Sequence, residues 1–461
     1  MKIIIIGGSH AGIACALRAR EEYPDSSIVI YEKQRSIGFG AQSIPLFLAG
    51  NNAFLKVSNY MTASDLEKLN IMVKTKTTVS EADLKKKVIY YKDLLDESDQ
   101  EIEDHYDKLI LATGSYPSMP LIKGGFLDKL YIVKQAEDAV KLKQFMKHSR
   151  SIIIIGGGSI AVEMARIMNE AQIKTTLIHS SDYILNRYLD REIGEEVQQF
   201  LEDKGIRILT NSTVTDITEE VIDENLRKKV SHVFTQDGRE FTADGVIYST
   251  GFRPNSVLVA DQVTLGERGA ILVDEYMRTS FPDVFAVGDC ATTMLSNVKA
   301  PAYITHASDA LREGDAAAVN LVEPKIKLNK SQGTYKINLD DEYIVSLAGL
   351  TFNKAKSEGF DCSQVFIRND DANNDKYYEI WLVYENETHK ILGLQSKGTA
   401  DEVASLADVI SLAIQEELTV QDIEYADFYF KHGFKNPSSF SKLLADKIRY
   451  KEKAEYLNER H

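Results

Sequence analysis

The chain has 461 residues, of which 44% are hydrophobic and 27% charged, and its formal net charge at pH 7 is −15. This length is too great for a single hydrophobic core and predicts two or three domains. The acidic balance argues against a protein that binds nucleic acid, and no apolar run approaches the roughly 20 residues that a membrane-spanning helix needs. Because the N-terminus opens on a strand without a signal-peptide pattern, we expect a cytoplasmic protein with no membrane span.

A strand, a tight turn and a helix at the N-terminus make the first motif with a chemical meaning. Four isoleucines lead into Gly7, and a second strand follows that ends in Glu32. In this pattern the backbone amides at the helix start bind a pyrophosphate, and the acidic residue after the second strand binds a ribose hydroxyl. The motif predicts a dinucleotide held by Gly7, Ser9, Ala11, Gly12, Glu32 and Lys33.

Two later strands end in similar turns. The strand at residues 108–111 turns at Ala112, Thr113 and Gly114, and another turns at Gly251. A strand followed by glycine is common in α/β proteins, so each turn alone is weak evidence. Their repetition is what two similar units would produce.

Between these turns lies a second glycine-rich motif. Four isoleucines precede Gly156, and Gly158, Ser159 and Ile160 lead into a helix that we expect to end near residue 171. Two such motifs in one chain, each between a strand and a helix, indicate two dinucleotides, with a flavin on the first and a nicotinamide on the second.

The second strand of this motif ends in His179 instead of a carboxylate. The group that would select an unphosphorylated ribose is therefore missing. Ser180 and Ser181, with Lys174 or Arg187 nearby, favour a ribose 2′-phosphate, which makes NADPH as good a candidate as NADH. The alternative is that His179 is a neutral surface residue and the site discriminates weakly.

A short strand that leads into Gly288 and Asp289 supports FAD in particular. Its end presents a carboxylate where the ribityl hydroxyls of a flavin need an acceptor, and Gly288 lets the backbone approach closely. Together with the first motif, this is the most specific sign of FAD in the sequence.

Over nearly its whole length the chain resembles the single-cysteine pyridine nucleotide-disulfide oxidoreductases, which include NADH oxidase, NADH peroxidase and coenzyme A disulfide reductase. The resemblance implies an α/β fold with two Rossmann-like dinucleotide-binding domains and a C-terminal α+β dimerisation domain, and therefore a homodimer. The expected boundaries are 1–115 with 253–325 for FAD, 116–252 for NAD(P) and 326–461 for the interface domain.

Some site residues are implied by this resemblance alone. Residues 37–50 correspond to the segment that carries the family's redox cysteine, and the matching residue is Gln42. His10 matches a histidine that faces this cysteine and the flavin, and Glu163 matches an acid near the nicotinamide. Ala307 opens a helix whose N-terminus is directed at the flavin ring.

Two places depart from the family pattern. Ser159 stands where a tyrosine usually covers the flavin, which predicts a more open flavin face. The loop at residues 425–429 lacks two prolines that lie near the partner's active site in the family. Tyr425 and Tyr429 are candidates for contacts there, although loop aromatics are more often packed into their own core.

The expected chemistry follows from the missing thiol, because Gln42 has no redox capacity. Cys15, Cys290 and Cys362 form no CxxC pattern, so we expect no metal site, and we interpret Cys15 and Cys290 as inert packed thiols. We expect an FAD-dependent NAD(P)H oxidoreductase that reduces oxygen to hydrogen peroxide, or reduces a quinone or another small acceptor. The alternative is a flavin-binding redox sensor with little turnover.

Overall fold

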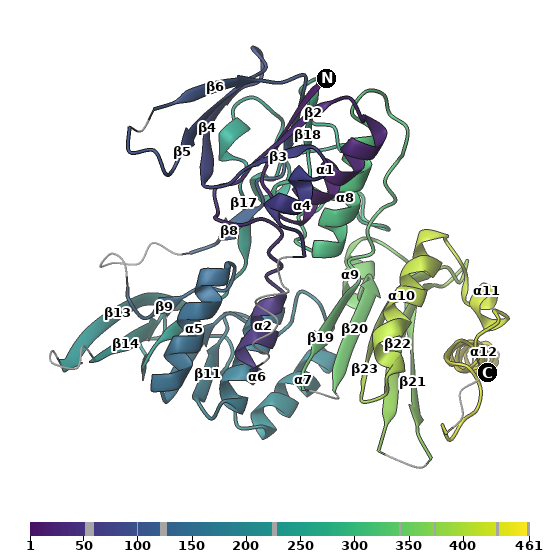
Figure 1. Cartoon of the computed structure of the whole chain (residues 1–461). Coiled ribbons are helices and arrows are strands. Elements are labelled where there is room, and N and C mark those ends of the chain that lie inside the picture. The colour runs from purple at the N-terminus through teal and green to yellow at the C-terminus, as the bar shows by residue number, and fades with distance from the viewer. Residues whose placement is uncertain are drawn as a thin grey trace.

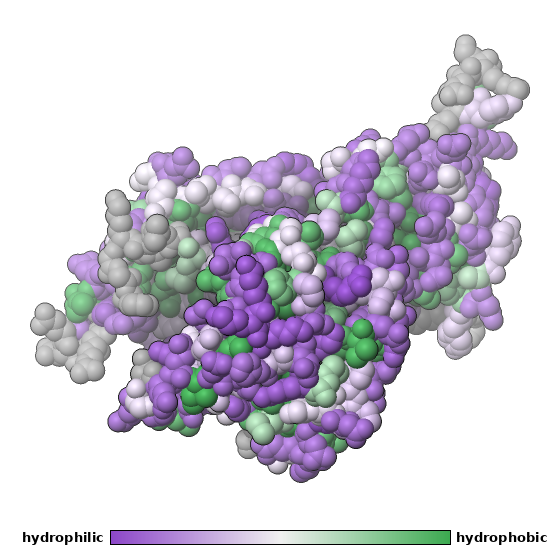
Figure 2. All heavy atoms as spheres, turned by 90° about the horizontal axis from the view of Figure 1, so that it is seen from above, coloured by the Kyte–Doolittle hydropathy of each residue, from purple (hydrophilic) through white to green (hydrophobic). Residues whose placement is uncertain are grey.

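The computed structural model describes residues 1–50, 60–98, 100–119, 127–223, 228–340, 343–372, 375–429 and 433–458. These residues form three units, which Figure 1 shows with the N-terminal unit at the top, the middle unit at the lower left and the C-terminal unit at the right. No helix in the described part is long and apolar enough to cross a membrane. The face seen in Figure 2 is largely hydrophilic, with apolar side chains in small scattered groups.

The first unit is built on a parallel sheet whose strands are, in spatial order, β18 (Val284–Ala286), β7 (Lys108–Leu111), β1 (Lys2–Ile6), β2 (Ser27–Tyr31) and β3 (Ile71–Lys74). The isoleucines of β1 are all buried, as is usual for parallel strands with both faces covered. Two helices, α1 (His10–Glu22) and α8 (Ala307–Val319), pack against each other here. An antiparallel sheet is added by β4 (Thr77–Asp83), β5 (Val88–Asp93) and β6 (Ile102–His105).

The second unit repeats this plan with a parallel sheet of β12 (Arg207–Leu209), β11 (Lys174–Ile178), β10 (Ser151–Ile155), β16 (Val246–Tyr248) and β9 (Leu130–Tyr131). Its helices are α5 (Ala136–His148), α6 (Ser159–Glu170) and α7 (Arg191–Asp203). It also has an antiparallel sheet of β13 (Val214–Asp223), β14 (Lys228–Thr235) and β15 (Glu240–Ala243). The parallel sheets confirm the expected α/β class.

The two chain crossings between these units lie side by side. They form an antiparallel pair of β8 (Ser115–Pro117) and β17 (Phe252–Pro254). The expected domain boundaries at residues 115 and 252 fall within this pair, and they stay a prediction.

The C-terminal unit is an antiparallel sheet of β19 (Tyr335–Asn338), β20 (Ile344–Gly349), β23 (Ile391–Gly398), β22 (Tyr377–Glu385) and β21 (Cys362–Asp370). Its helices are α9 (Phe352–Ser357), α10 (Glu402–Gln415), α11 (Val420–Glu424) and α12 (Phe440–Asn458). Tyr425 and Tyr429 are 83% and 91% exposed in the single chain. The expectation that such loop aromatics pack into their own core is therefore wrong here.

One short helix of the N-terminal part belongs, by its packing, to the second unit. Helix α2 (Ser43–Leu48) follows Gln42 directly and contacts α5 and α6. Its Ile44, Phe47 and Leu48 join the hydrophobic core of the second unit. This packing holds Gln42 at the junction of the two nucleotide-binding units.

A buried carboxylate joins the second unit to the C-terminal one. Asp190 accepts hydrogen bonds from the backbone amides of Phe352 and Asn353, at 2.9 and 3.2 Å, and from Gln395 Nε2 at 2.7 Å. The two amides open helix α9, so Asp190 supplies the acceptors that a helix N-terminus needs.

We expect Asp190→Ala to destabilise the protein because it leaves buried donors without an acceptor, at a cost of about 1–3 kcal/mol for each donor. Asp190→Asn keeps one side-chain oxygen and should lose less stability. Urea unfolding of both variants, with the exposed Asp25→Ala as the control, measures this. An Asp190→Ala variant within about 0.5 kcal/mol of wild type, the range of ordinary surface changes, would contradict the assignment.

A second buried carboxylate supports the turn at Gly288. Glu313 of α8 accepts hydrogen bonds from the Gly288 amide, at 2.7 Å, and from the Thr293 hydroxyl. Burial, together with the charges of Asp309 and Asp289, raises the pKa of Glu313 from 4.5 to about 8, against the hydrogen bonds from Thr293 and Gly288, which lower it. The folded protein therefore keeps this carboxyl protonated at a pH where the unfolded chain has lost the proton.

A raised pKa in the folded state means that this stabilisation is complete below about pH 4.5 and is lost as the pH rises towards about 8. Glu313→Gln keeps an acceptor for Gly288 and removes the titration. The midpoint of thermal unfolding should therefore fall less between pH 5 and pH 8 in this variant than in wild type, and Glu97→Gln, at an exposed residue, should behave as wild type. Parallel pH profiles for wild type and Glu313→Gln would show that the residue does not titrate in this way.

Candidate functional site

A cavity of about 2420 Å³ opens between the three units and is lined by residues from all of them. A pocket for one small ligand usually measures ~300–1,000 Å³, so this cavity has room for more than one. Of the site residues predicted from the sequence, those that line it are His10, Gln42, Glu163, Gly7, Ser9, Ala11, Glu32, Lys33, Ala112, Thr113, Gly114, Gly156, Gly158, Ser159, Ile160, His179, Gly251, Gly288, Asp289 and Ala307.

Gly12 is the predicted site residue that does not line the cavity. A side chain there would place its Cβ 2.0 Å from the carbonyl oxygen of Gly7. Gly12 therefore allows α1 to pack closely against the turn, and its neighbours in the turn face the cavity.

The two glycine turns are equivalent in the two units. Gly7 and Gly156 have φ angles of +113° and +131°, which side chains rarely adopt. A Cβ at Gly7 would lie 2.1 Å from the backbone oxygen of Ala112, and one at Gly156 would lie 2.0 Å from that of Ser249. Only glycine lets each turn cross the end of the neighbouring strand so closely.

Helices α1 and α6 start at the cavity without a side-chain cap. Neither Ser9 nor Gly158, their N-cap residues, makes a capping hydrogen bond through its side chain. By contrast, α4 (Ala63–Glu67) and α11, which lie away from the cavity, begin with Thr62 and Thr419, whose hydroxyls accept a backbone amide. The free amides of α1 and α6 fit the pyrophosphates of two dinucleotides.

Glu32 is fixed at the end of β2. Its backbone amide donates to Lys74 O, and its carboxylate accepts the amides of Gly8 and Gln34, each at 2.7 Å. The carboxylate is therefore anchored to the first turn and can still accept a ribose hydroxyl.

His179 occupies the equivalent place in the second unit. Its backbone amide donates to Leu209 O, and its ring lies over Gly157, where a Cβ would be 2.5 Å from the ring. Burial lowers the pKa of His179, and the charge of Arg187 adds to this effect, so the ring is neutral at pH 7. Arg187, Ser180 and Ser181 line the cavity beside it.

Of the two cations that the sequence offered as alternatives, Lys174 does not belong to this group. It begins β11, and His179 follows the last residue of that strand. The two residues therefore lie at opposite ends of an extended strand, and Lys174 does not line the cavity. Of the two candidate cations, Arg187 alone has the required position.

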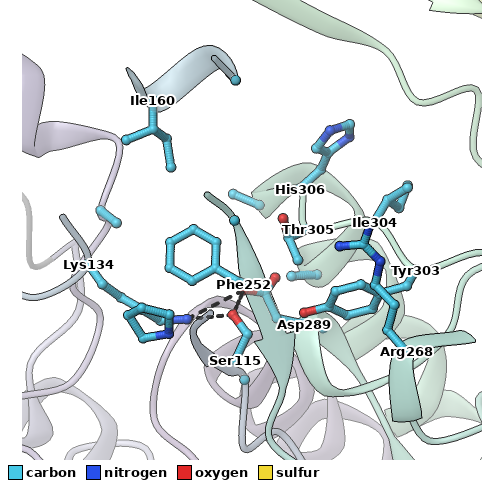
Figure 3. A pocket seen from close by; sticks show the side chains of 18 of the residues that line it. Ser115, Lys134, Ile160, Phe252, Arg268, Asp289, Tyr303, Ile304, Thr305 and His306 are labelled. Carbon is cyan, nitrogen blue, oxygen red and sulfur yellow. Dashed lines mark hydrogen bonds and ion pairs between the residues drawn. The ribbon is translucent and has the colours of Figure 1, made fainter. Parts of the chain in front are cut away.

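Lys134 is a site residue that the sequence analysis missed. Its Nζ donates to Ser115 Oγ at 2.5 Å, Ser115 donates to Asp289 at 2.7 Å, and the ammonium lies over the ring of Phe252 at 4.5 Å (Figure 3). Burial lowers the pKa of Lys134 to about 8. Lys134 belongs to no motif, and a lone lysine after an apolar strand was its only sequence signal.

His10 and Gln42 meet at the junction of the two units. Gln42 Nε2 lies 3.4 Å from His10 Nε2, and the ring of Tyr60 lies 5.6 Å from that of His10. Burial lowers the pKa of His10, against the opposing charge of Asp289, so this imidazole is neutral at pH 7. A neutral imidazole can both accept and donate a proton.

The three cysteines are buried and do not line the cavity. Burial raises the pKa of Cys15, Cys290 and Cys362, so all three remain thiols at neutral pH. The thiol of Cys290 donates a hydrogen bond to the carbonyl oxygen of Leu111, inside the protein. The expectation that Cys15 and Cys290 are packed thiols agrees with this burial.

Ser159 opens α6, and Glu163 follows one turn later. Burial raises the pKa of Glu163, which Arg166 and Lys336 partly oppose. Another tyrosine lies beside Ser159, and the more open flavin face stays a prediction. Tyr335, from the C-terminal sheet, donates to Ser159 Oγ at 3.2 Å and fills this part of the cavity wall.

Comparisons with known proteins agree with this site. Residues 1–314 match the family model described as pyridine nucleotide-disulphide oxidoreductase. An NADH oxidase from Enterococcus faecalis is 32% identical over 96% of this chain and 98% of its own length. A CoA-dependent NAD(P)H sulfur oxidoreductase from Pyrococcus furiosus is 30% identical over 94% of this chain and 96% of its own.

Two solved structures have the same architecture. One is a water-forming NADH oxidase from Lactobacillus brevis bound to NADH, with a TM-score of 0.91 and 28% identity over 98% of each chain. The other is an engineered water-forming NADPH oxidase bound to NADPH, with a TM-score of 0.92 and 29% identity over 98% of this chain and 99% of that one. The family model that covers residues 1–314 and the NADH oxidase that is 32% identical over 96% of the chain show that the chain belongs to the pyridine nucleotide-disulphide oxidoreductase family.

Proposed function

We propose that this protein is an FAD-dependent NAD(P)H oxidase that reduces oxygen to hydrogen peroxide without a cysteine redox centre. The observation that carries the proposal is the thiol-free cavity. Gln42 lies beside His10, and all three cysteines are buried away from the wall. Family membership and the NADH oxidase relatives support the oxidase activity.

The first unit would hold FAD. The amides that open α1 would bind its pyrophosphate, Glu32 its adenosine ribose, and Asp289, which Ser115 and Lys134 orient, its ribityl chain. The N-terminus of α8 at Ala307 also has no side-chain cap and would face the flavin ring. When bound, FAD supplies an acceptor for the hydride of NAD(P)H and a donor of two electrons to oxygen.

The product follows from electron counting. NAD(P)H carries two electrons, and oxygen with two electrons and two protons is hydrogen peroxide. Reduction to water needs two more electrons, which a redox-active thiolate could relay at such a site. In the absence of a thiolate on the wall, we assign the protein the two-electron reaction, with one proton from the medium and His10 as the group that delivers protons to oxygen.

Anaerobic mixing of the yellow holoprotein with NADH or NADPH should bleach the flavin, and air should then give one hydrogen peroxide for each nucleotide oxidised. Cys290→Ser should give the same yield, because that thiol is buried outside the cavity. A peroxide assay with and without catalase measures the product. Oxidation without peroxide would refute the two-electron reaction, and a flavin that neither nucleotide bleaches would favour a redox sensor instead.

The nicotinamide site suits a phosphorylated ribose. A neutral His179, two serines and Arg187 line the place where Glu32 stands in the first unit. Because no carboxylate among the described residues repels a 2′-phosphate there, we propose that NADPH is accepted at least as well as NADH.

Arg187→Ala should therefore raise the KM for NADPH by about 10- to 100-fold, the effect of losing a hydrogen bond to a charged group, and change the KM for NADH much less. Lys174→Ala, at the far end of β11, is the matched control and should change neither value. Steady-state kinetics with both nucleotides measures this. An equal rise in the KM for NADPH and for NADH in Arg187→Ala would contradict the assignment of Arg187 to the 2′-phosphate.

We also propose a homodimer formed through the C-terminal unit. Tyr425, Tyr429 and Tyr450 are 83%, 91% and 74% exposed there, and aromatic side chains are enriched in protein interfaces. The cytoplasmic location stays a prediction.

A further inference from the structure

Three aromatic rings stack in the cavity, and each comes from a different unit. The ring of Tyr335 lies between His306, at a centroid distance of 5.1 Å, and Tyr188, at 5.6 Å. The interplanar angles are 21° and 26°, so both contacts are stacked. His306 precedes α8 of the first unit, Tyr188 precedes α7 of the second, and Tyr335 begins β19 of the C-terminal sheet.

The hydroxyl of Tyr335 fixes the ring over the start of α6. It donates to Ser159 Oγ at 3.2 Å, although the two residues are 176 positions apart. Burial, together with the nearby charge of Glu163, raises the pKa of Tyr335 to about 12, although the hydrogen bond to Ser159 lowers it, so the phenol keeps its proton and remains a donor. Tyr335 therefore contacts the start of α6 in the second unit through its hydroxyl, and the start of α8 in the first unit through its ring.

Tyr335 lies between the starts of α6 and α8, where the proposed nicotinamide and flavin sites would meet. A dinucleotide held at the N-terminus of α6 must extend its nicotinamide towards the flavin, beside the N-terminus of α8. Hydride transfer requires the reacting atoms to come within about 3–3.5 Å, which leaves no room for a third ring between them. A nicotinamide that reached the flavin between these helix starts would need the place of the Tyr335 ring, which stacks on Tyr188 and His306.

We propose that Tyr335 is a residue of the nicotinamide site contributed by the C-terminal unit, whose ring occupies the nicotinamide position in the free protein. Nucleotide binding breaks the bond from Tyr335 to Ser159 and turns the ring aside. The affinity for the nicotinamide is thus set in part by a residue outside both nucleotide-binding units. This inference rests on the proposed function, because it takes the second unit as the nicotinamide site.

The test measures binding without turnover. NAD⁺ and NADP⁺ are titrated into the oxidised holoprotein, and the dissociation constant is read from the change in flavin absorbance. Tyr335→Phe keeps the ring and removes the hydroxyl, so the closed position loses one hydrogen bond and the nucleotide should bind about two- to tenfold more tightly. Ser159→Ala removes the same bond from the other side and should give a similar gain.

The double variant identifies the interaction. If both changes act through one hydrogen bond, the double variant should bind no more tightly than either single variant. Tyr343→Phe is the matched control, because Tyr343 lies in the same unit, packs on Phe200 and does not line the cavity. It should leave the dissociation constant unchanged, and the flavin content of each preparation shows that the variant has folded.

An unchanged or weaker affinity in Tyr335→Phe would overturn the proposal, because the ring would then be a fixed part of the wall or a direct contact of the bound nucleotide. Additive gains in the double variant would also overturn it. Failure of the proposed function looks different. In that case the wild-type flavin is not bleached by NADH or NADPH, whatever the affinities of the variants for the oxidised nucleotides.

Discussion

The close crossing of each glycine turn over a neighbouring strand end is the constraint on which the site depends. At Gly7 and Gly156 the backbone passes so near a carbonyl oxygen that any Cβ would overlap it. The crossing sets where α1 and α6 begin, and therefore where their free amides point. Gly12 is a second glycine that this arrangement requires in the first unit, since it lets α1 pack against the turn at Gly7.

Packing between units then brings the two turns to one cavity. The side chains of α2 enter the core of the second unit, which fixes Gln42 where the two sites meet, and Asp190 ties α7 to α9 of the C-terminal unit. The ring of Tyr335 reaches Ser159 only because β19 packs on the second unit, with Ile337 in the shared core. The C-terminal unit is thus part of the site, in addition to any role in assembly.

Burial explains why three cysteines do not restore thiol chemistry. Each is buried, and burial disfavours the thiolate, which is the reactive form. Three of the ionisable groups that line the cavity, His10, Lys134 and Glu163, are each shifted by burial towards their neutral form.

The amino-acid pattern predicts the two nucleotide-binding units, their order and twenty of the residues that line the cavity. Glycine turns between a strand and a helix are local, and their steric and hydrogen-bonding requirements can be read from adjacent residues. The other side chains of the site could be identified only from the folded chain. Lys134 and Tyr335 belong to no motif. Arg187 could be chosen over Lys174 only because β11 places Lys174 at the end of the strand that is far from the cavity. The positions of these three side chains depend on packing between residues that are far apart in the sequence, and a local sequence pattern carries no information about such contacts.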